Sequence, residues 1–259
     1  MCGFFNCKYD VVCSLGSDCM PATYLKASCL RNASYPFDWT IQPSFDVKAR
    51  LVLSGFGGFL EPANVREYPS LPSNTNHVSH VDDGTGTIFL HDFDPGVETG
   101  EMLATVRARY ARRIRRLLDA VRGGRRVLFV NFEREQNDTP TERFTAFLDA
   151  VAKAYPGSRV SLLVLKNRPG VFEEEQVAPN LMIIRAGFYP PGVEFPGDRD
   201  VARRVFSRIR PAGALRRFNL GMRTRRLLIR LVSHLAILGG ARRRLRGRLQ
   251  KRFGVPAAL

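Results

Sequence analysis

The chain has 259 residues, 44% of them hydrophobic and 10% aromatic, which is enough for one sizeable core with or without an appendage. Its formal net charge of +16 is concentrated at one end, because all 24 Asp and Glu but only 23 of the 40 Lys and Arg lie in residues 1–200. Five cysteines without paired spacing exclude a disulfide framework and a zinc cluster, and no run of 18 apolar residues predicts a transmembrane helix.

Apolar strands and amphipathic helices succeed one another from residue 9 to residue 184. Strands are predicted at 9–15, 87–90, 126–132, 160–165 and 181–184, with a weak strand at 77–81 inside a polar loop. Helices are predicted at 21–30, with Asp18 as N-cap, and at 44–53, 99–121 and 141–154. This order predicts an α/β fold, with a mostly parallel central sheet and helices on both faces.

The charge distribution predicts two parts, an α/β catalytic domain at 1–200 and a basic helical segment at 201–259. Leucines at helical spacing from Leu227 to Leu238, followed by a second basic stretch after Gly239-Gly240, favour an anionic membrane surface or an acidic partner. Nucleic acid is the less favoured partner, because aromatic residues that could stack on bases are scarce in this segment. The chain starts without a secretory signal pattern, so we expect a cytoplasmic protein, with peripheral membrane attachment as an option.

The stretch D-V-V-C-S-L-G-S-D-C-M-P-A, residues 10–22, has the order strand, small-residue turn, cysteine, proline and helix. A thiol at a helix N-terminus meets unpaired amides and a partial positive charge, both of which favour the thiolate. Cys19 is therefore a candidate nucleophile, and Gly16, Ser17 and the helix amides are candidates for holding an oxyanion. The alternative is that Cys19 is a packed apolar residue, as we expect for Cys13 and Cys29.

A cysteine nucleophile needs a base, and His91 in L-H-D-F is the best placed of four histidines. Asp92 and Asp38 are candidates for orienting it, although adjacent strand residues such as His91 and Asp92 point to opposite faces. Trp39, beside Asp38 in P-F-D-W, anchors its loop or contacts substrate. His77 and His80 lack a third ligand nearby, so neither a metal nor another cofactor is expected.

Four motifs occur in order: V-V-C-S-L-G-S-D-C-M-P-A, L-R-N-A-S-Y-P-F-D-W, F-L-H-D-F and R-R-V-L-F-V. Together they resemble a bacterial family catalogued as predicted papain-like cysteine peptidases, otherwise recorded as a domain of unknown function. The resemblance covers roughly residues 9–190. It implies Cys19 as nucleophile, His91 as base, a peptide or other carbonyl substrate, and a papain-like α+β fold as the alternative to α/β.

Two further hypotheses remain from the residues themselves. Strand, S-L-G-S and helix in an α/β frame are similar to the nucleophile turn of small serine esterases and some carbohydrate-modifying enzymes, in which case Ser14 or Ser17 matters. Those esterases place their other catalytic residues in a D-x-x-H motif near the C-terminus. This sequence lacks such a motif there, which argues against the comparison. The remaining alternative is a non-catalytic module that binds a sugar or peptide in the same cleft and is held at a membrane surface by its C-terminal segment.

Overall fold

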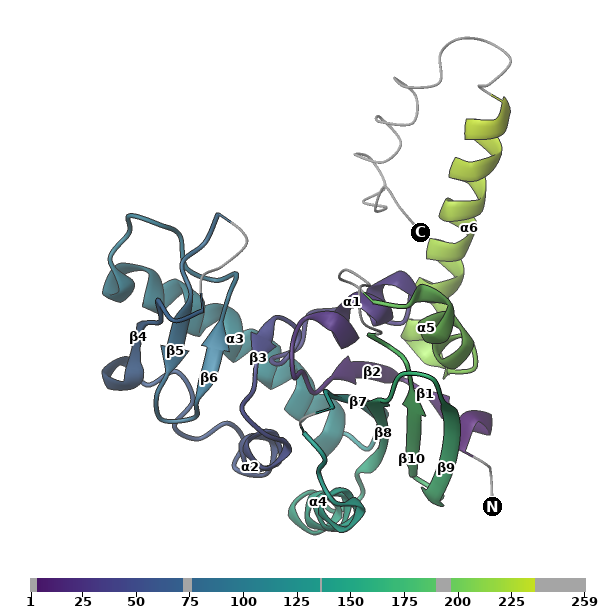
Figure 1. The fold of residues 1–259 in the computed structure, drawn as a ribbon, viewed down its shortest axis with the longest axis horizontal. Coiled ribbons are helices and arrows are strands. Elements are labelled where there is room, and N and C mark those ends of the chain that lie inside the picture. Colours follow the sequence, from purple (N-terminus) through teal and green to yellow (C-terminus); the bar gives the residue numbers. More distant parts are fainter. Residues whose placement is uncertain (1–3, 72–75, 136, 190–196, 236–259) are drawn as a thin grey trace.

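The computed structural model describes residues 4–71, 76–135, 137–189 and 197–235. Its centre is a five-stranded sheet in the order β2-β7-β8-β10-β9 (Figure 1). Strands β2 (Val11–Ser14), β7 (Arg126–Glu133), β8 (Arg159–Asn167) and β10 (Leu181–Ala186) are parallel, whereas β9 (Phe172–Ala178) pairs antiparallel with β10 at the edge. The predicted α/β class with a mostly parallel sheet is confirmed.

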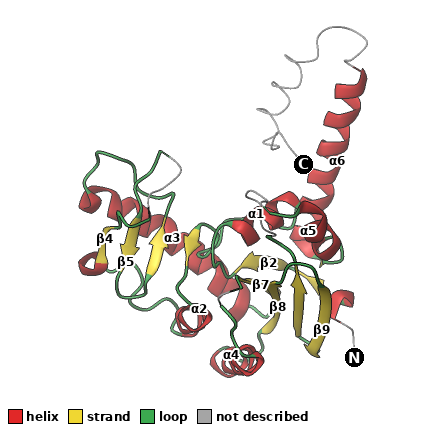
Figure 2. Ribbon diagram, in the orientation of Figure 1, coloured by secondary structure: helices red, strands yellow, loops and turns green. Residues whose placement is uncertain are grey.

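Alternating side chains of the central strands build two cores, one on each face of the sheet. Val127 and Phe129 lie in the first core with α2 (Phe45–Leu53), α3 (Thr99–Arg122) and α4 (Thr141–Ala154). Leu128 and Val130 lie in the second core with α1 (Met20–Ala27) and α5 (Arg199–Phe206). Successive residues of a strand point to opposite faces, so the near-continuous apolar run of β7 is the pattern of a strand buried on both sides. Figure 2 shows the sheet between red helices.

A second, antiparallel sheet lies beside the main one in the order β3-β6-β5-β4 (Figure 1). It contains β3 (Thr40–Ile41), β4 (Val65–Glu67), β5 (His80–Asp82) and β6 (Thr87–Phe89), with the short helix η2 (Pro62–Asn64) before β4. Phe89 of this sheet packs in the first core with Tyr110 of α3, their ring centroids 5.4 Å apart. The long segment between α1 and α3 therefore shares the core of the parallel sheet.

The C-terminal part begins inside the second core. Val205 and Phe206 of α5, Ile209 and Leu215 are buried there, and β11 (Arg210–Pro211) pairs in parallel with β1 (Lys8–Tyr9), which follows the short helix η1 (Phe4–Asn6). Helix α6 (Gly213–Leu235) then extends away from the body (Figure 1). The division at residue 200 stays a prediction, and the second basic stretch after Gly239 lies outside the described residues. No helix in the described ranges is long and apolar enough to cross a membrane.

Candidate active site

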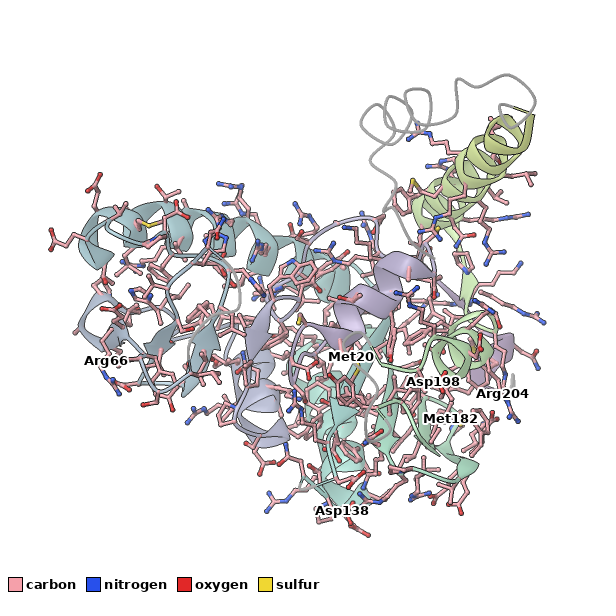
Figure 3. All side chains as sticks on the ribbon, turned by 45° about the horizontal axis from the view of Figure 1, so that its top comes forward. Met20, Arg66, Asp138, Met182, Asp198 and Arg204 are labelled. Carbon is pink, nitrogen blue, oxygen red and sulfur yellow. The ribbon has the colours of Figure 1, made fainter. Side chains whose placement is uncertain are left out.

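Candidate functional side chains gather where the parallel strands end, at the edge formed by Ser14, Glu133, Asn167 and Ala186. In open α/β sheets this carboxyl edge is where ligands bind, because the loops that leave the strands converge there. Two hollows open on it, one of about 190 Å³ and one of about 220 Å³. The labelled Met20, at the start of α1, lines the first hollow and the labelled Asp138 lines the second (Figure 3).

The turn between β2 and α1 is held in an unusual backbone conformation. Gly16 has φ +79° and Ser17 has φ +110°, a value that a residue with a side chain rarely adopts. A Cβ on Gly16 would stand 3.1 Å from the carbonyl oxygen of Phe37, so any other residue would be crowded against that segment as well as strained in its backbone. The Gly16 amide donates to Ser14 Oγ at 2.7 Å, which takes this amide out of the expected set of oxyanion donors and gives Ser14 a structural contact.

Cys19 is the N-cap residue of α1 and is half-buried. Asp18 Oδ1, one residue earlier, accepts a hydrogen bond from the Met20 amide at 2.8 Å, so Asp18 caps the helix from outside the N-cap position. Burial and the neighbouring Asp18 raise the pKa of the Cys19 thiol to about 11, and the guanidinium of Arg134 offsets this only in part. The expected lowering of this pKa is therefore wrong, because burial outweighs the favourable helix terminus. Cys13 and Cys29 are buried, as predicted.

His91 lies in the loop after β6 and contacts Trp39 and His77, with ring centroids 6.2 and 6.3 Å away. Partial burial lowers the pKa of His91, and Asp92 opposes that shift. No hydrogen bond or ring contact joins His91 to Cys19 within the described residues. The structure thus brings together two predicted site residues, His91 and Trp39. Cys19 belongs to a different segment, the turn between β2 and α1.

The two candidate orienting carboxylates have other partners. Asp92 is buried and accepts hydrogen bonds from Arg109 Nη1 at 2.7 Å and Tyr110 Oη at 2.8 Å, both on α3. Asp38 is fully buried, and its Oδ2 accepts from Arg31 Nε at 2.7 Å and from the Tyr35 amide at 2.9 Å. Burial raises the pKa of Asp38, and Arg31 counteracts this rise. Both carboxylates therefore fix the loops that carry Trp39 and His91.

Arg31 connects Asp38 to the Trp39 side chain, because its guanidinium lies 5.1 Å from the indole centroid. Two further histidines, His77 and His80, have local partners. His77 Nδ1 lies 3.1 Å from Asp94 Oδ1, and His80 stacks on Phe93 with centroids 3.8 Å apart. Across the described ranges, no group of three or more His, Cys, Asp and Glu is arranged to hold a metal ion.

Sequence reasoning missed a buried polar cluster beside the turn. Lys48 of α2 is 2% exposed, and its Nζ donates to Ser17 Oγ and to Asn131 Oδ1, both at 2.7 Å. Glu133, also buried, accepts a weak hydrogen bond from Asn131 Nδ2 at 3.5 Å. One signal could have revealed Lys48: it shares the apolar face of its helix with Phe45, Leu51 and Val52.

Comparison with known proteins identifies the family of this chain. A family model described as "Putative papain-like cysteine peptidase", a domain of unknown function, matches residues 10–162, and the chain belongs to that family. An uncharacterized protein of Acanthamoeba polyphaga mimivirus is 28% identical over 150 residues, which cover 52% of this chain and 67% of the viral protein. Because this relative is viral, the expected bacterial origin gains no support from it. No solved structure matches the chain.

Proposed function

We propose that this protein is a thiol-dependent hydrolase or acyltransferase of peptides or related carbonyl compounds, with Cys19 as nucleophile and His91 as base. The observation that carries the proposal is the position of Cys19, which caps a helix that follows the parallel strand β2 at the edge of the main sheet, in a chain of the family described as "Putative papain-like cysteine peptidase". A nucleophile at this place faces the convergent loops of the carboxyl edge.

The protonation states define the chemistry. With a thiol pKa of about 11 and a lowered pKa for His91, the resting pair at neutral pH is a thiol and a neutral imidazole. His91 then acts as a general base that takes the thiol proton as sulfur attacks the carbonyl carbon, and returns it to the leaving group. The two side chains must approach for this transfer, so substrate binding would have to move the loop after β6 toward the turn.

The test combines labelling with turnover. Iodoacetamide should label Cys19 faster than the buried Cys13 and Cys29 in the folded protein, with mapping by mass spectrometry. Cys19→Ala and His91→Ala should each abolish turnover of a panel of peptide substrates, and loss in only one of them would contradict the pair. Activity should rise with pH through a value below 6.5 and then level, because His91 must be neutral to accept a proton.

A second proposal concerns helix α6. We propose that α6 binds an anionic membrane surface, because Leu220, Leu227 and Leu228 are each more than half exposed on a helix that carries many arginines and no acidic residue. Such a helix can insert its leucines among lipid chains while arginines contact the headgroups.

Full-length protein should sediment with phosphatidylserine vesicles and not with phosphatidylcholine vesicles. Replacing the three leucines by serine should reduce this binding. Point variants are preferable to truncation at residue 200, which would remove Val205, Phe206, Ile209 and Leu215 from the second core. Equal sedimentation of the wild type and the triple variant would contradict the proposal.

A further inference from the structure

Ser17 and Lys48 form a direct side-chain contact across 31 residues of sequence, with Lys48 Nζ 2.7 Å from Ser17 Oγ. The Ser17 hydroxyl donates to the carbonyl oxygen of Phe132 at the end of β7. When Lys48 is charged, it donates to Ser17 and to Asn131. When Lys48 is neutral, its lone pair can accept the Ser17 proton after rotation of one O–H bond, with no heavy atom moving.

The position of Ser17 is that of a reacting residue. It sits between a parallel strand and a helix, with a positive φ that a hydroxyl-bearing residue adopts only where the surroundings impose it. The amide of Asp18, the next residue, donates to no acceptor within the described part of the chain. In strand-turn-helix sites, the amide that follows the nucleophile is one of the donors to the oxyanion.

Stability alone does not account for a lysine at position 48. Its ammonium is buried and forms no salt bridge with any described carboxylate; Glu133 and Asp18 act on it only at longer range. Taking an unpaired ammonium out of water costs free energy that a methionine of similar length would avoid. Burial lowers the pKa of Lys48 to about 7, so a large share of the amine is neutral at physiological pH.

Both residues line the hollow of about 220 Å³, which contains Gln42, Glu133 and Thr139 as well. This volume lies below the range of about 300–1,000 Å³ that is usual for drug-sized ligands. Most lining side chains offer hydrogen bonds, and Pro43 and Phe45 supply the apolar surface. The hollow therefore suits a group of a few heavy atoms attached to a polar molecule.

We propose that Ser17 and Lys48 form a serine–lysine acyl-transfer pair that acts on short-chain esters or amides of polar molecules. This pair goes beyond the thiol chemistry proposed above and does not require Cys19 or His91. It uses a different nucleophile on the same turn and a base from α2.

The reaction has two balanced steps. Ser17 Oγ forms a bond to the acyl carbon as its proton passes to Lys48 Nζ, and the bond from that carbon to the leaving oxygen or nitrogen breaks as Lys48 returns the proton to it. Solvent water then attacks the acyl-enzyme and gives one proton to Lys48, which passes it to Ser17 Oγ as the carboxylic acid leaves. No oxidant, reductant or metal takes part in either step.

A short-chain fluorophosphonate tests the pair, because a reactive serine displaces fluoride from phosphorus and keeps the phosphonyl group. Peptide mapping should find this group on Ser17 in the wild type and in Cys19→Ala, and Ser17→Ala should abolish it. Lys48→Met should slow labelling about 100-fold or more, the usual contribution of a general base. Lys166→Met is the matched control, since Lys166 is a second buried lysine whose polar partners in the described part of the chain are Asp138, the Thr139 carbonyl and Glu133 rather than Ser17, and it should label at close to the wild-type rate.

A pH profile on the unmodified protein keeps the proposal testable if Lys48→Met does not fold. The labelling rate should rise with pH through about 7, where Lys48 loses its proton. Labelling confined to other residues, a folded Lys48→Met that reacts at the wild-type rate, or a flat profile from pH 5.5 to 8.5 would each overturn the pair. Iodoacetamide labelling of Cys19 is read separately, so a failure of the thiol proposal is distinguishable from a failure of this one.

Discussion

Replacing Lys48 by methionine should change the pH dependence of stability in a way that no surface lysine would. Folding moves the Lys48 side chain from water to a site where it is 2% exposed, and its pKa falls from 10.5 to about 7. Between these two values the unfolded chain binds a proton that the folded chain does not. The stability of the wild type should therefore increase as pH rises from 7 to 10.5 through this group.

The magnitude follows from the size of the shift. One pKa unit corresponds to about 1.4 kcal/mol, so the full cost of keeping Lys48 protonated in the folded state is about 5 kcal/mol below pH 7 and vanishes above pH 10.5. Because the folded amine is half protonated at pH 7, the change between pH 7 and pH 9 is about 2 kcal/mol. Lys48→Met lacks this contribution at every pH.

Urea unfolding of the wild type and Lys48→Met at pH 7 and pH 9 measures the effect. Any change of the hydrogen bonds to Ser17 and Asn131 with the lysine proton is part of the same pKa shift, so the pH dependence of the difference between the two proteins measures that shift. The free energy of unfolding of the wild type should rise relative to that of the variant by about 2 kcal/mol over this interval. The same difference in unfolding free energy between the two proteins at pH 7 and pH 9 would refute the claim that burial lowers the pKa of Lys48.

Two further predictions address the loops that hold the site. Asp92→Asn should lower the free energy of unfolding by about 2 kcal/mol in urea, because the charged acceptor of Arg109 and Tyr110 is lost; a change below about 0.5 kcal/mol would show that this buried pair is not structural. Gly16→Ala should cost about 2 kcal/mol, since it combines a positive φ with a Cβ 3.1 Å from the Phe37 carbonyl. Gly58→Ala is its control, with φ +75° but nothing within 4 Å of the added Cβ, and it should cost about 1 kcal/mol; equal losses would contradict the packing argument.

The sequence predicted the central architecture well because buried strands and amphipathic helices have strong periodicities. Helix α4 begins and ends at the predicted residues, Thr141 and Ala154, and α2 has Ser44 as its N-cap with a side chain that accepts from the Val47 amide. Strand β9 was missed because its sequence, F-E-E-E-Q-V-A, is polar and exposed at the sheet edge. This segment forms a strand because it pairs with β10, and its own residues carry no pattern that predicts the pairing.

The candidate site was predictable only in its local part. The turn from Ser14 to Cys19 stood out because a glycine, small residues and a proline mark the passage from strand to helix. The contact between Ser17 and Lys48 depends on how α2 lies relative to the end of β7. The pattern of apolar and polar residues within each segment does not encode that arrangement. Asn131 is an amide inside the apolar strand β7, and the sequence alone does not reveal that its Oδ1 accepts a hydrogen bond from Lys48 Nζ at 2.7 Å.

The most direct test of the whole account is to trap the acyl-enzyme. The protein should be mixed with a chromogenic short-chain ester, quenched in acid during turnover and mapped by mass spectrometry. We predict an acyl group on the turn between β2 and α1, at Ser17 for the serine–lysine pair or at Cys19 for the thiol. Turnover with the acyl group on any other residue, or with no acyl-enzyme at all, would contradict the claim that this turn carries the nucleophile.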